Sequence, residues 1–205
     1  MRDGFAVAAR FRRTGSGARM RVGVLALQGD FEAHAKALER AGAEPVEVRT
    51  AAELDVVCGL VIPGGESTTM LKLMEYYGLF EPLREFGRAR PVFGTCAGAI
   101  LIASEVLNPS QASLALVDLA IERNGYGRQL DSRVVRVGQH QLGGDPELEV
   151  VLIRAPIIRR TAGAVLATYL DAPILVDYGR HLVATFHPEL SADTRVHRLF
   201  LSKLS

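Results

Sequence analysis

The sequence predicts an α/β fold with a doubly wound, mostly parallel central sheet flanked by helices and an antiparallel extension in the second half. In the first half, apolar strand segments alternate with helical segments, an order typical of parallel sheets with right-handed crossovers. Val22–Leu27 is continuously apolar, as a strand covered on both faces requires. After residue 114, short strand-like runs follow one another without helices between them. Together these features predict a flavodoxin-like sheet with added antiparallel strands.

The first half of the chain contains the elements that alternate. A helix is expected over Phe31–Ala41, because Gly42 follows it and glycine favours a helix C-terminus. Ser67 is placed to cap the next helix, whose apolar residues recur at helical spacing and indicate core packing. The cysteine-containing segment after residue 93 is expected to turn from strand into helix. The further predicted strands are Pro45–Val48, Val56–Ile62 and Val92-Phe93.

The second half is expected to supply the antiparallel extension and a closing helix. Tyr178-Gly179-Arg180-His181 carries turn residues between two apolar runs and predicts a hairpin loop. The closing helix is expected from about Asp193 to Leu201. The predicted strands are Leu114–Ile121, Val134–Val137, Val150–Ile153, Val165–Tyr169, Ile174–Asp177 and Leu182–Phe186.

Length and composition limit the classes of function. The 205 residues suit one domain, taken as residues 20–205. Residues 1–19, with five arginines and one acidic residue, are interpreted as a leader outside the fold, either a transit peptide or the product of an upstream start codon or of cloning. The balance of 24 Lys and Arg against 23 Asp and Glu argues against nucleic acid or an anionic membrane as the main partner.

Two further features of the composition bear on location and cofactors. No apolar run approaches the roughly 20 residues that span a bilayer. The two cysteines, Cys58 and Cys96, make neither a disulfide framework nor a plausible zinc site. We therefore expect a cytoplasmic protein that binds no metal and no cofactor.

Cys96 is the first candidate catalytic residue. Gly94-Thr95-Cys96-Ala97-Gly98 has the form G-x-C-x-G, the thiol counterpart of the strained strand-to-helix elbow that exposes a nucleophile above a sheet. Small neighbours are a steric requirement of that turn. Unpaired N–H groups at the helix start favour a thiolate, but an ordinary thiol is only a few per cent ionised at pH 7, so a base is needed. Cys58, inside a predicted strand, is interpreted as a buried packing residue.

His187 is the candidate base. It follows a predicted strand and stands two residues before Glu189, and residues two apart on a strand face the same way. Glu189 can then fix the tautomer through one ring nitrogen while the other takes the proton from Cys96. The remaining histidines lack such a neighbour and are expected to be surface or structural residues: His34, His140, His181 and His197.

The glycine pair after the third strand is a candidate oxyanion loop. Pro63-Gly64-Gly65-Glu66-Ser67 can place backbone N–H groups beside the elbow, because glycine permits close approach and unusual dihedral angles. A plain tight turn is the alternative interpretation of the two glycines alone.

Six segments of the chain carry a resemblance to a known family: VGVLALQGDF (22–31), IPGGESTT (62–69), FGTCAGA (93–99), ERNGYGRQLDS (122–132), IRAP (153–156) and FHPEL (186–190). Through them the chain resembles the class I (triad) glutamine amidotransferases, over nearly all of residues 20–205. The elbow and the HPE triplet are signals of the whole class. The other segments point, within it, to the glutaminase subunits of pyridoxal 5'-phosphate synthases.

The resemblance implies roles for the motif residues. Cys96 is the nucleophile, His187 the base and Glu189 its orienter, and the oxyanion donors are the N–H groups of Gly65 and Ala97. Arginine is well suited to grip an α-carboxylate through two hydrogen bonds. The residues implied to hold glutamine are Gly64, Gly65, Glu66, Arg123, Ile153 and Arg154.

The chain departs from the family pattern at a few positions, none in the triad. Gly125-Tyr126 stands where Ala-Phe is expected, Arg133 where an aromatic residue is usual, and Ala115 where glycine is expected. These departures concern the packing around Arg123 and the glutamine pocket.

The resemblance also implies a reaction and a partner. Cys96 attacks the side-chain amide of L-glutamine, ammonia leaves as a γ-glutamyl thioester forms, and water releases glutamate. Ammonia then passes to a (β/α)8-barrel synthase subunit that makes pyridoxal 5'-phosphate, in vitamin B6 biosynthesis, within a large hetero-oligomer. Gln28-Gly29-Asp30 is expected to serve either contact with that partner or loop closure, and we favour the contact.

Two other functions fit the same fold. One is a cysteine hydrolase or thiol chaperone of the Parkinsonism-protein and intracellular-protease superfamily, whose sites usually lack the late HPE. The other is a non-catalytic regulatory module that kept the elbow by descent. Glutaminase activity that disappears in Cys96→Ala would distinguish a glutaminase from the cysteine hydrolase or chaperone. Selective labelling of Cys96 over Cys58 by a glutamine-analogue electrophile would argue against the regulatory module.

Overall fold

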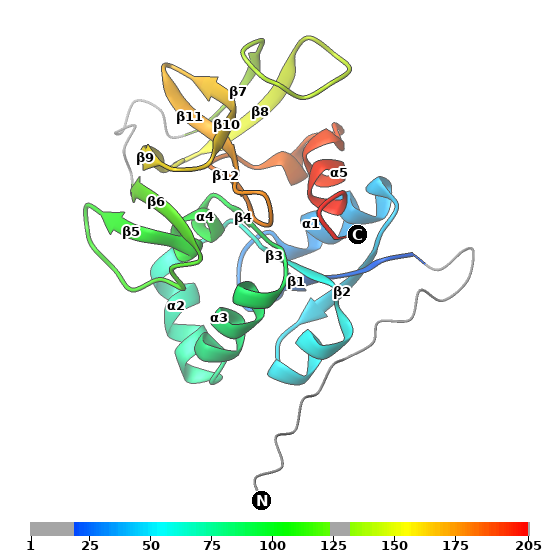
Figure 1. The fold of residues 1–205 in the computed structure, drawn as a ribbon, viewed down its shortest axis with the longest axis vertical. Coiled ribbons are helices and arrows are strands. Elements are labelled where there is room, and N and C mark those ends of the chain that lie inside the picture. The colour runs from blue at the N-terminus through cyan, green and yellow to red at the C-terminus, as the bar shows by residue number, and fades with distance from the viewer. Residues whose placement is uncertain (1–18, 124–131, 205) are drawn as a thin grey trace, which may run out of the picture.

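The computed structural model describes residues 19–123 and 132–204 and forms an α/β arrangement around one seven-stranded sheet (Figure 1). The predicted leader, except Arg19, therefore lies outside the described residues, and so does Gly125-Tyr126. The helices are α1 (Phe31–Ala41), α2 (Ser67–Tyr76), α3 (Phe80–Ala89), α4 (Ala97–Ile102) and α5 (Arg195–Leu201). The strands are β1 (Arg21–Leu25), β2 (Glu44–Val48), β3 (Gly59–Ile62), β4 (Val92–Thr95), β5 (Ala103–Leu107), β6 (Val117–Glu122), β7 (Ser132–Val137), β8 (Leu148–Ile153), β9 (Ile157–Thr161), β10 (Ala164–Tyr169), β11 (Ala172–Asp177) and β12 (Leu182–Ala184).

The central sheet has the predicted doubly wound topology. Its strand order is β10-β11-β12-β4-β3-β1-β2, in which β2, β1, β3, β4 and β12 pair in parallel and β11 and β10 add antiparallel strands. From the β2 edge, the parallel part follows the 2-1-3-4-5 order of flavodoxin-like sheets, which bind ligands at the carboxyl edge near the switch point between β1 and β3. The predicted fold class is confirmed.

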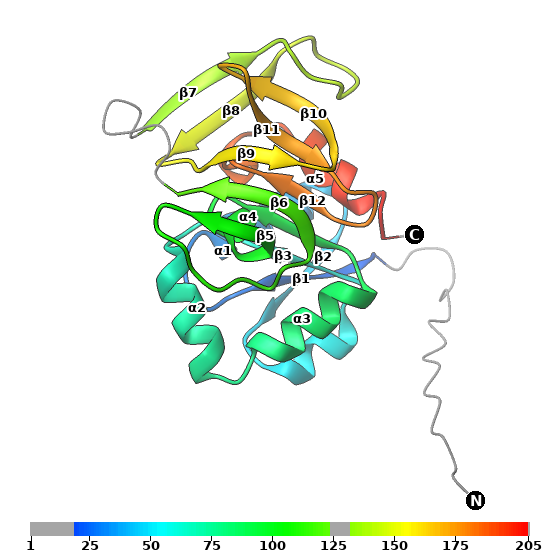
Figure 2. The same ribbon diagram turned by 60° about the vertical axis from the view of Figure 1, so that its left-hand side comes forward.

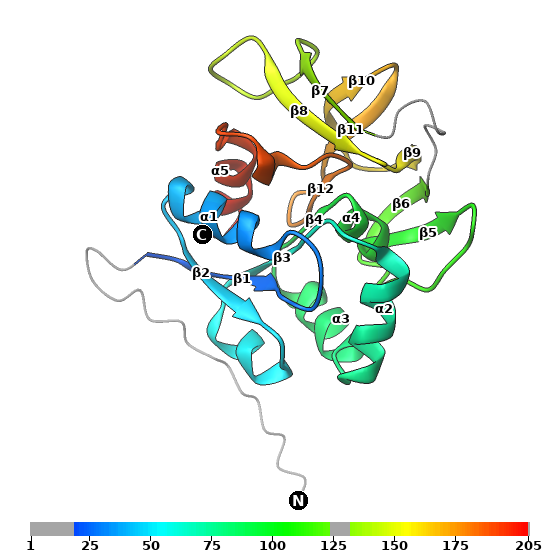
Figure 3. The ribbon, with the colours of Figure 1, turned by 180° about the vertical axis from the view of Figure 1, so that it is seen from behind.

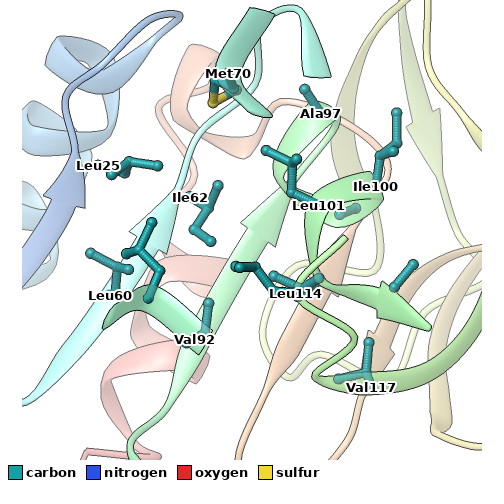
Figure 4. Packing of buried hydrophobic residues seen from close by; sticks show 14 of the residues in the cluster. Leu25, Leu60, Ile62, Met70, Val92, Ala97, Ile100, Leu101, Leu114 and Val117 are labelled. Carbon is teal, nitrogen blue, oxygen red and sulfur yellow. The ribbon is translucent and has the colours of Figure 1, made fainter. Parts of the chain in front are cut away.

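Helices cover both faces of the sheet, as Figure 3 shows from behind. On one face, Leu38 of α1 and Phe200 of α5 pack against Val24 and Phe93 of the sheet. On the other, α2, α3 and α4 enclose a second apolar cluster, part of which is seen in Figure 4, where Met70 and Leu101 lie beside Ile62. Because β3 and β4 are buried at every residue, neither sequence alternates between apolar and polar residues, although β4 ends at the polar Thr95. No helix among the described residues is long and apolar enough to span a membrane.

The second half departs from the predicted single extension. Of the second-half strands, β12 joins the main sheet in parallel and β11 and β10 extend it antiparallel, whereas β5-β6-β9 and β7-β8 form two smaller sheets beside it (Figure 2). Strand β5 was not predicted, because its sequence ASEVL shows no strict alternation and its pairing partner, the parallel strand β6, is provided by tertiary structure. The hairpin loop at residues 178–181 between β11 and β12 is confirmed, and the closing helix begins at Arg195, two positions after the predicted start.

Helix α3 was also not predicted, because Pro82 and Gly87 read as helix breakers. Pro82 lies in the first turn, where its missing N–H needs no partner within the helix. Gly87 is required by packing, since a Cβ there would lie 2.3 Å from Leu116 Cδ1. Both residues therefore suit a helix at their particular positions.

The predicted strand Val56–Ile62 is too long at its start. Val56 ends a 3-10 turn over Ala51–Val56, closed at its beginning by a reciprocal pair of hydrogen bonds between Thr50 and Glu53, and β3 begins only at Gly59. Cys58 therefore precedes the strand. It is half-buried and its thiol donates to the Arg21 carbonyl at 3.2 Å, so its interpretation as a fully buried packing residue was wrong.

Ala115 stands in a backbone conformation that favours glycine. Its φ angle is 51°, in the left-handed region. The neighbours on both sides hold it there, because the N–H groups of Leu114 and Leu116 donate to the carbonyls of Leu101 and Ile102 at 2.7 and 2.9 Å. The glycine expected from the family pattern is thus the residue that this turn accommodates without strain.

Replacing Ala115 with glycine should stabilise the protein by about 0.5–1 kcal/mol. Relief of about 1–2 kcal/mol of backbone strain outweighs the larger conformational entropy that glycine gives the unfolded chain, about 0.5–1 kcal/mol. Urea unfolding measures the difference. Ala112→Gly, in the same loop but exposed and without a positive φ, is the matched control and should destabilise slightly. Equal effects of the two substitutions would contradict the argument from strain.

Candidate active site

Cys96 occupies a sharp turn between β4 and α4. Its φ and ψ angles are 47° and −104°, a conformation that costs a residue with a Cβ about 1–3 kcal/mol. Two backbone hydrogen bonds hold it: the Cys96 N–H donates to Ala184 in β12 at 2.9 Å, and its carbonyl accepts from Ile100 at 3.3 Å. This is the geometry expected of a nucleophile elbow.

The two glycines of the elbow are steric requirements, as predicted. A Cβ at Gly98 would lie 1.9 Å from the Ile62 carbonyl oxygen, and one at Gly94 would lie 2.6 Å from the Gly98 carbonyl oxygen. The chain therefore packs backbone against backbone where the elbow crosses β3. Because α4 has only six residues, its dipole supplies less positive potential at Cys96 than a long helix would.

His187 and Glu189 meet as predicted, but not on a strand. β12 ends at Ala184, and Glu189 lies in a 3-10 turn over Pro188–Leu190. His187 Nδ1 is 2.7 Å from Glu189 Oε1, and both side chains are buried. The loop is fixed at His187, whose backbone N–H donates to the Val151 carbonyl in β8 at 2.9 Å. The expected strand geometry was wrong, yet the turn brings the two side chains together.

Cys96 and Glu189 determine the ionisation of His187 between them. Burial lowers the pKa of the imidazole, but its hydrogen bonds to the Cys96 sulfur and the Glu189 carboxylate outweigh burial and raise the pKa to about 10. Burial also raises the pKa of Glu189, and the hydrogen bond from His187 opposes that rise. An imidazolium is thus favoured between sulfur and carboxylate.

The glycine loop forms the wall opposite Cys96. A Cβ on Gly64 would lie 2.3 Å from His187 Cε1, so the imidazole packs directly on that backbone. Gly65 has a φ angle of 151°, and a Cβ there would meet Gln28 Oε1 at 2.6 Å. These contacts require glycine at both positions, so the pair is more than a plain turn.

Gln28-Gly29-Asp30 supports this loop from the end of β1. Gln28 Oε1 accepts from the Glu66 N–H at 2.9 Å, and the Asp30 N–H donates to the Gly64 carbonyl at 3.3 Å. The segment therefore supports the glycine loop, whereas loop closure, the less favoured of the two expectations, stays a prediction. Contact with a partner chain stays a prediction.

A cavity of about 370 Å³ opens above the thiol, a volume that suits a small metabolite. All predicted substrate-binding residues except Gly64 line it, and so does Ala97, the second predicted oxyanion residue. Gly64 stands behind His187 instead. The sequence did not assign Gln28, Asp30, Ser67 or Ile100 to the substrate site; position after β1 was the available signal for the first two. The lining residues are Gln28, Asp30, Gly65, Glu66, Ser67, Cys96, Ala97, Ile100, Arg123, Ile153, Arg154 and His187.

Charged groups in the cavity have distinct settings. The Glu66 carboxylate, and not Ser67, caps α2 by accepting from the N–H groups of Thr68 and Thr69, which corrects the predicted cap. Burial raises the pKa of Glu66, but these bonds and the Thr69 hydroxyl lower it to about 2. Glu66 Oε1 also lies 3.2 Å from the Arg123 guanidinium. Arg154 lines the cavity and makes no ion pair with any described residue.

The other histidines are mostly buried. His34, His181 and His197 are buried, so none of them is a surface residue. His181 Nδ1 accepts from the Val92 N–H at 3.2 Å, and His140, half-buried, accepts from the Leu142 N–H at 3.2 Å.

One group of side chains has the composition of a metal site. Asp30, His187 and Glu189 place ligand atoms within 4.8 Å of one another. Nδ1 of His187 is already hydrogen-bonded to Glu189, an arrangement that holds a proton there rather than a metal. The arrangement suits a thiolate nucleophile, a base and an orienting carboxylate.

Comparisons with known proteins point to one family. A family model described as the SNO glutamine amidotransferase family matches residues 24–205. The chain is 59% identical over 190 residues to the pyridoxal 5'-phosphate synthase subunit PdxT of Solibacter usitatus, covering 90% of this chain and 99% of that protein. It is 52% identical over 184 residues to the subunit of the same name from Koribacter versatilis, covering 89% and 94%.

Solved structures agree with this result. A crystal structure described as a glutamine amidotransferase has a TM-score of 0.81 and 44% sequence identity, covering 89% of this chain and 98% of that one. PurLQS from Thermotoga maritima, with a TM-score of 0.61 and 16% identity over 91% of this chain and 100% of that one, shares the fold.

Gly64→Ala should slow alkylation of Cys96 by iodoacetamide at pH 7 by about tenfold or more. The added methyl group displaces the imidazole, so the base that takes the proton of the thiol is no longer in place. Mass spectrometry gives the rate, with Cys58 in the same chain as reference. Gly138→Ala, whose Cβ would approach only the Pro146 carbonyl at 3.9 Å, is the control. A wild-type rate in Gly64→Ala would show that His187 does not activate the thiol.

Proposed function

The chain belongs to the SNO glutamine amidotransferase family, and from this membership we propose that it acts as the glutaminase subunit of a pyridoxal 5'-phosphate synthase. It hydrolyses L-glutamine to L-glutamate and ammonia. The observation that carries the proposal for the site is the strained elbow of Cys96 beside the buried pair of His187 and Glu189, at the floor of a cavity lined with charged groups.

In the first half of the reaction, the Cys96 thiolate attacks the side-chain amide carbon of glutamine and forms a carbon–sulfur bond. The carbonyl oxygen becomes an oxyanion, for which the N–H groups of Gly65 and Ala97 are the proposed donors. Ala97 is the first residue of α4, so its N–H has no partner within the helix. His187 then gives its proton to the amide nitrogen, the carbon–nitrogen bond breaks, and ammonia leaves a γ-glutamyl thioester.

In the second half, water attacks the thioester. His187, now neutral, accepts a proton from the water, and the carbon–sulfur bond breaks as glutamate forms. The Cys96 thiolate and the His187 imidazolium are restored. Glu189 keeps Nδ1 protonated throughout and leaves Nε2 for transfer, which is the role of the carboxylate in a catalytic triad.

The charged residues of the cavity suit the backbone end of glutamine. Arg154, without an ion pair among the described residues, is the proposed partner of the α-carboxylate. Glu66, ionised at neutral pH because its pKa is about 2, is the proposed partner of the α-ammonium group. Arg123 holds Glu66 in place through their ion pair, which makes its proposed contact with glutamine indirect. Ile153 completes the proposed binding site as a backbone wall, and Gly64 contributes from behind His187, against whose ring it packs.

The proposed partner is a (β/α)8-barrel synthase subunit that receives ammonia and makes pyridoxal 5'-phosphate, within a large hetero-oligomer. The names of the PdxT relatives as synthase subunits support it. Gln28-Gly29-Asp30 lies at the active-site edge and is the proposed contact. We further propose that residues 20–205 form the amidotransferase domain, with residues 1–19 outside it, and that the protein is cytoplasmic, which its two free cysteines support.

Cys96→Ala should abolish release of glutamate from glutamine, because no other described group in the cavity can form the thioester. The assay uses the full chain with and without a synthase subunit and follows glutamate. Cys58→Ala is the control and should keep wild-type activity, since Cys58 lies outside the cavity. Wild-type protein that turns over no glutamine in complex with the synthase, but shows peptidase or glyoxalase-type activity, would establish the cysteine hydrolase instead.

Arg154→Ala should raise KM for glutamine by roughly 10- to 100-fold with a smaller change in kcat. A charge-assisted hydrogen bond to the α-carboxylate contributes about 1.5–3 kcal/mol to binding of substrate and transition state alike. Arg154→Lys should give a KM between those of the wild type and Arg154→Ala, because lysine keeps the charge but lacks the planar guanidinium. Steady-state kinetics in the complex measures both. Arg84→Ala, on α3 and outside the residues that line the cavity, is the control. An unchanged KM in Arg154→Ala would assign the carboxylate to another residue.

A further inference from the structure

The orienting carboxylate is supported at only one of its two oxygens by the triad. Glu189 Oε1 is bound by His187, whereas Oε2 is buried and makes no hydrogen bond to any residue that the structure describes. His34 Nε2 lies 3.2 Å from Oε2, and both side chains are fully buried. A buried anionic oxygen without a donor is strongly unfavourable, so the proton on that nitrogen matters.

His34 also touches the nucleophile's neighbour. It projects from α1, and its Nε2 is 2.9 Å from the hydroxyl oxygen of Thr95, the residue before Cys96. Its other nitrogen, Nδ1, is 3.0 Å from Nε2 of His197 in α5. One imidazole therefore joins α1 and α5 to both the elbow and the orienting carboxylate.

The position of the proton on His34 follows from its neighbours. If the proton were on Nδ1, a lone pair on Nε2 would face the Glu189 oxygen at 3.2 Å. His197 would then have to carry its own proton on Nδ1, an atom that has no hydrogen-bond partner among the described residues. If Nε2 carries it, the N–H meets the Thr95 hydroxyl oxygen at 2.9 Å and places its positive hydrogen beside Glu189 Oε2, 3.2 Å from the nitrogen. His197 then donates from Nε2 to His34, and only a lone pair on His197 Nδ1 is left unpaired, which costs less than an orphaned N–H.

The surrounding charges keep His34 neutral. Burial, followed by His197 and His187, lowers the pKa of His34 well below its ordinary value. Burial and the nearby Arg40 lower the pKa of His197 to about 4. The Asp30 carboxylate, 3.5 Å from His187 Nδ1, is the remaining charged group beside His187 and Glu189. A neutral donor at Oε2 leaves the negative charge of Glu189 available to the imidazolium of His187.

We propose that His34 is a positioning residue of the active site: its Nε2–H, fixed by His197, donates to Glu189 Oε2 and holds the carboxylate against His187. Only the expected effect of His34 on glutamine turnover rests on the proposed function. The support extends from α5 through two histidines to the triad, so the helices on one face of the sheet determine the alignment of the base.

The tautomer of His34 is measurable in the unaltered protein. Nitrogen-15 NMR of the histidine-labelled full chain between pH 6 and 8 should show His34 neutral with the proton on Nε2. A proton on Nδ1, or a charged ring, would overturn the proposal. This measurement uses no glutamine and no variant, so it decides the question even where a substitution prevents folding.

Two substitutions separate positioning from packing. His34→Leu fills the site with an apolar side chain but removes the donor. It should lower kcat about tenfold or more, with KM within about twofold. The pH profile of Cys96 alkylation should shift to higher pH. His34→Gln can still donate to Glu189 and should recover most of both. His181→Gln, at another buried histidine far from the cavity, is the control and should leave the alkylation profile unchanged.

A wild-type alkylation profile and kcat in His34→Leu would show that Glu189 is held without His34. Equal losses in the leucine and glutamine variants would show that shape, not the donor, is what the site requires, and would equally overturn the proposal. Alkylation and NMR report on His187 without turnover. A protein that hydrolyses no glutamine would therefore refute the proposed function while leaving the effect of His34 on the triad measurable.

Discussion

The 2.7 Å hydrogen bond between His187 and Glu189 is the interaction on which the site depends. Both groups are buried, and a buried carboxylate is tolerated only where donors meet it. The bond lies in a loop rather than a strand, so its geometry is secured from outside, by the Val151 carbonyl at His187 and by the Gly64 backbone under the imidazole. The pKa of His187, raised to about 10 although burial alone would lower it, measures how strongly sulfur and carboxylate hold the proton.

The sheet brings these remote residues to one edge. In a parallel sheet the carboxyl ends of β1, β3, β4 and β12 lie side by side, and each carries part of the site: Gln28, the Gly64-Gly65 loop, Cys96 and His187 in turn. The glycines are the positions where these chain segments touch most closely. A Cβ at Gly29 would lie 1.8 Å from the Gly64 carbonyl oxygen, so the loops after β1 and β3 pack as closely as the elbow packs on β3. Rigid backbone contacts of this kind let a short loop hold a reacting group in a fixed position.

Some of this arrangement is visible in the sequence, because its causes are local. Alternating strand and helix patterns identify the doubly wound sheet, and the elbow follows from the small residues that flank Cys96. Features caused by tertiary contacts are not visible in the same way. Gly87 reads as a helix breaker until Leu116 is seen to pack on it, and Glu66 is identified as a cap only when α2 has a defined start. His34 looks like an ordinary polar residue of an amphipathic helix, because its partners are 61 and 163 residues away in the chain.

The triad also bears on stability, and the signs of the pKa shifts show how. The folded pKa of His187 is raised from 6.5 to about 10, so the stability it contributes is fully present below pH 6.5 and is lost as pH rises through 10. The folded pKa of Glu189 is raised too, chiefly by burial, so its contribution is present below pH 4.5 and declines above, as the carboxylate ionises in a buried site. Burial thus makes an ionised Glu189 costly in stability, and the hydrogen bond from His187 opposes that cost. Cys96 adds backbone strain at the same place. The free energy from packing of the helices on the sheet must therefore offset both the buried carboxylate and the strained elbow.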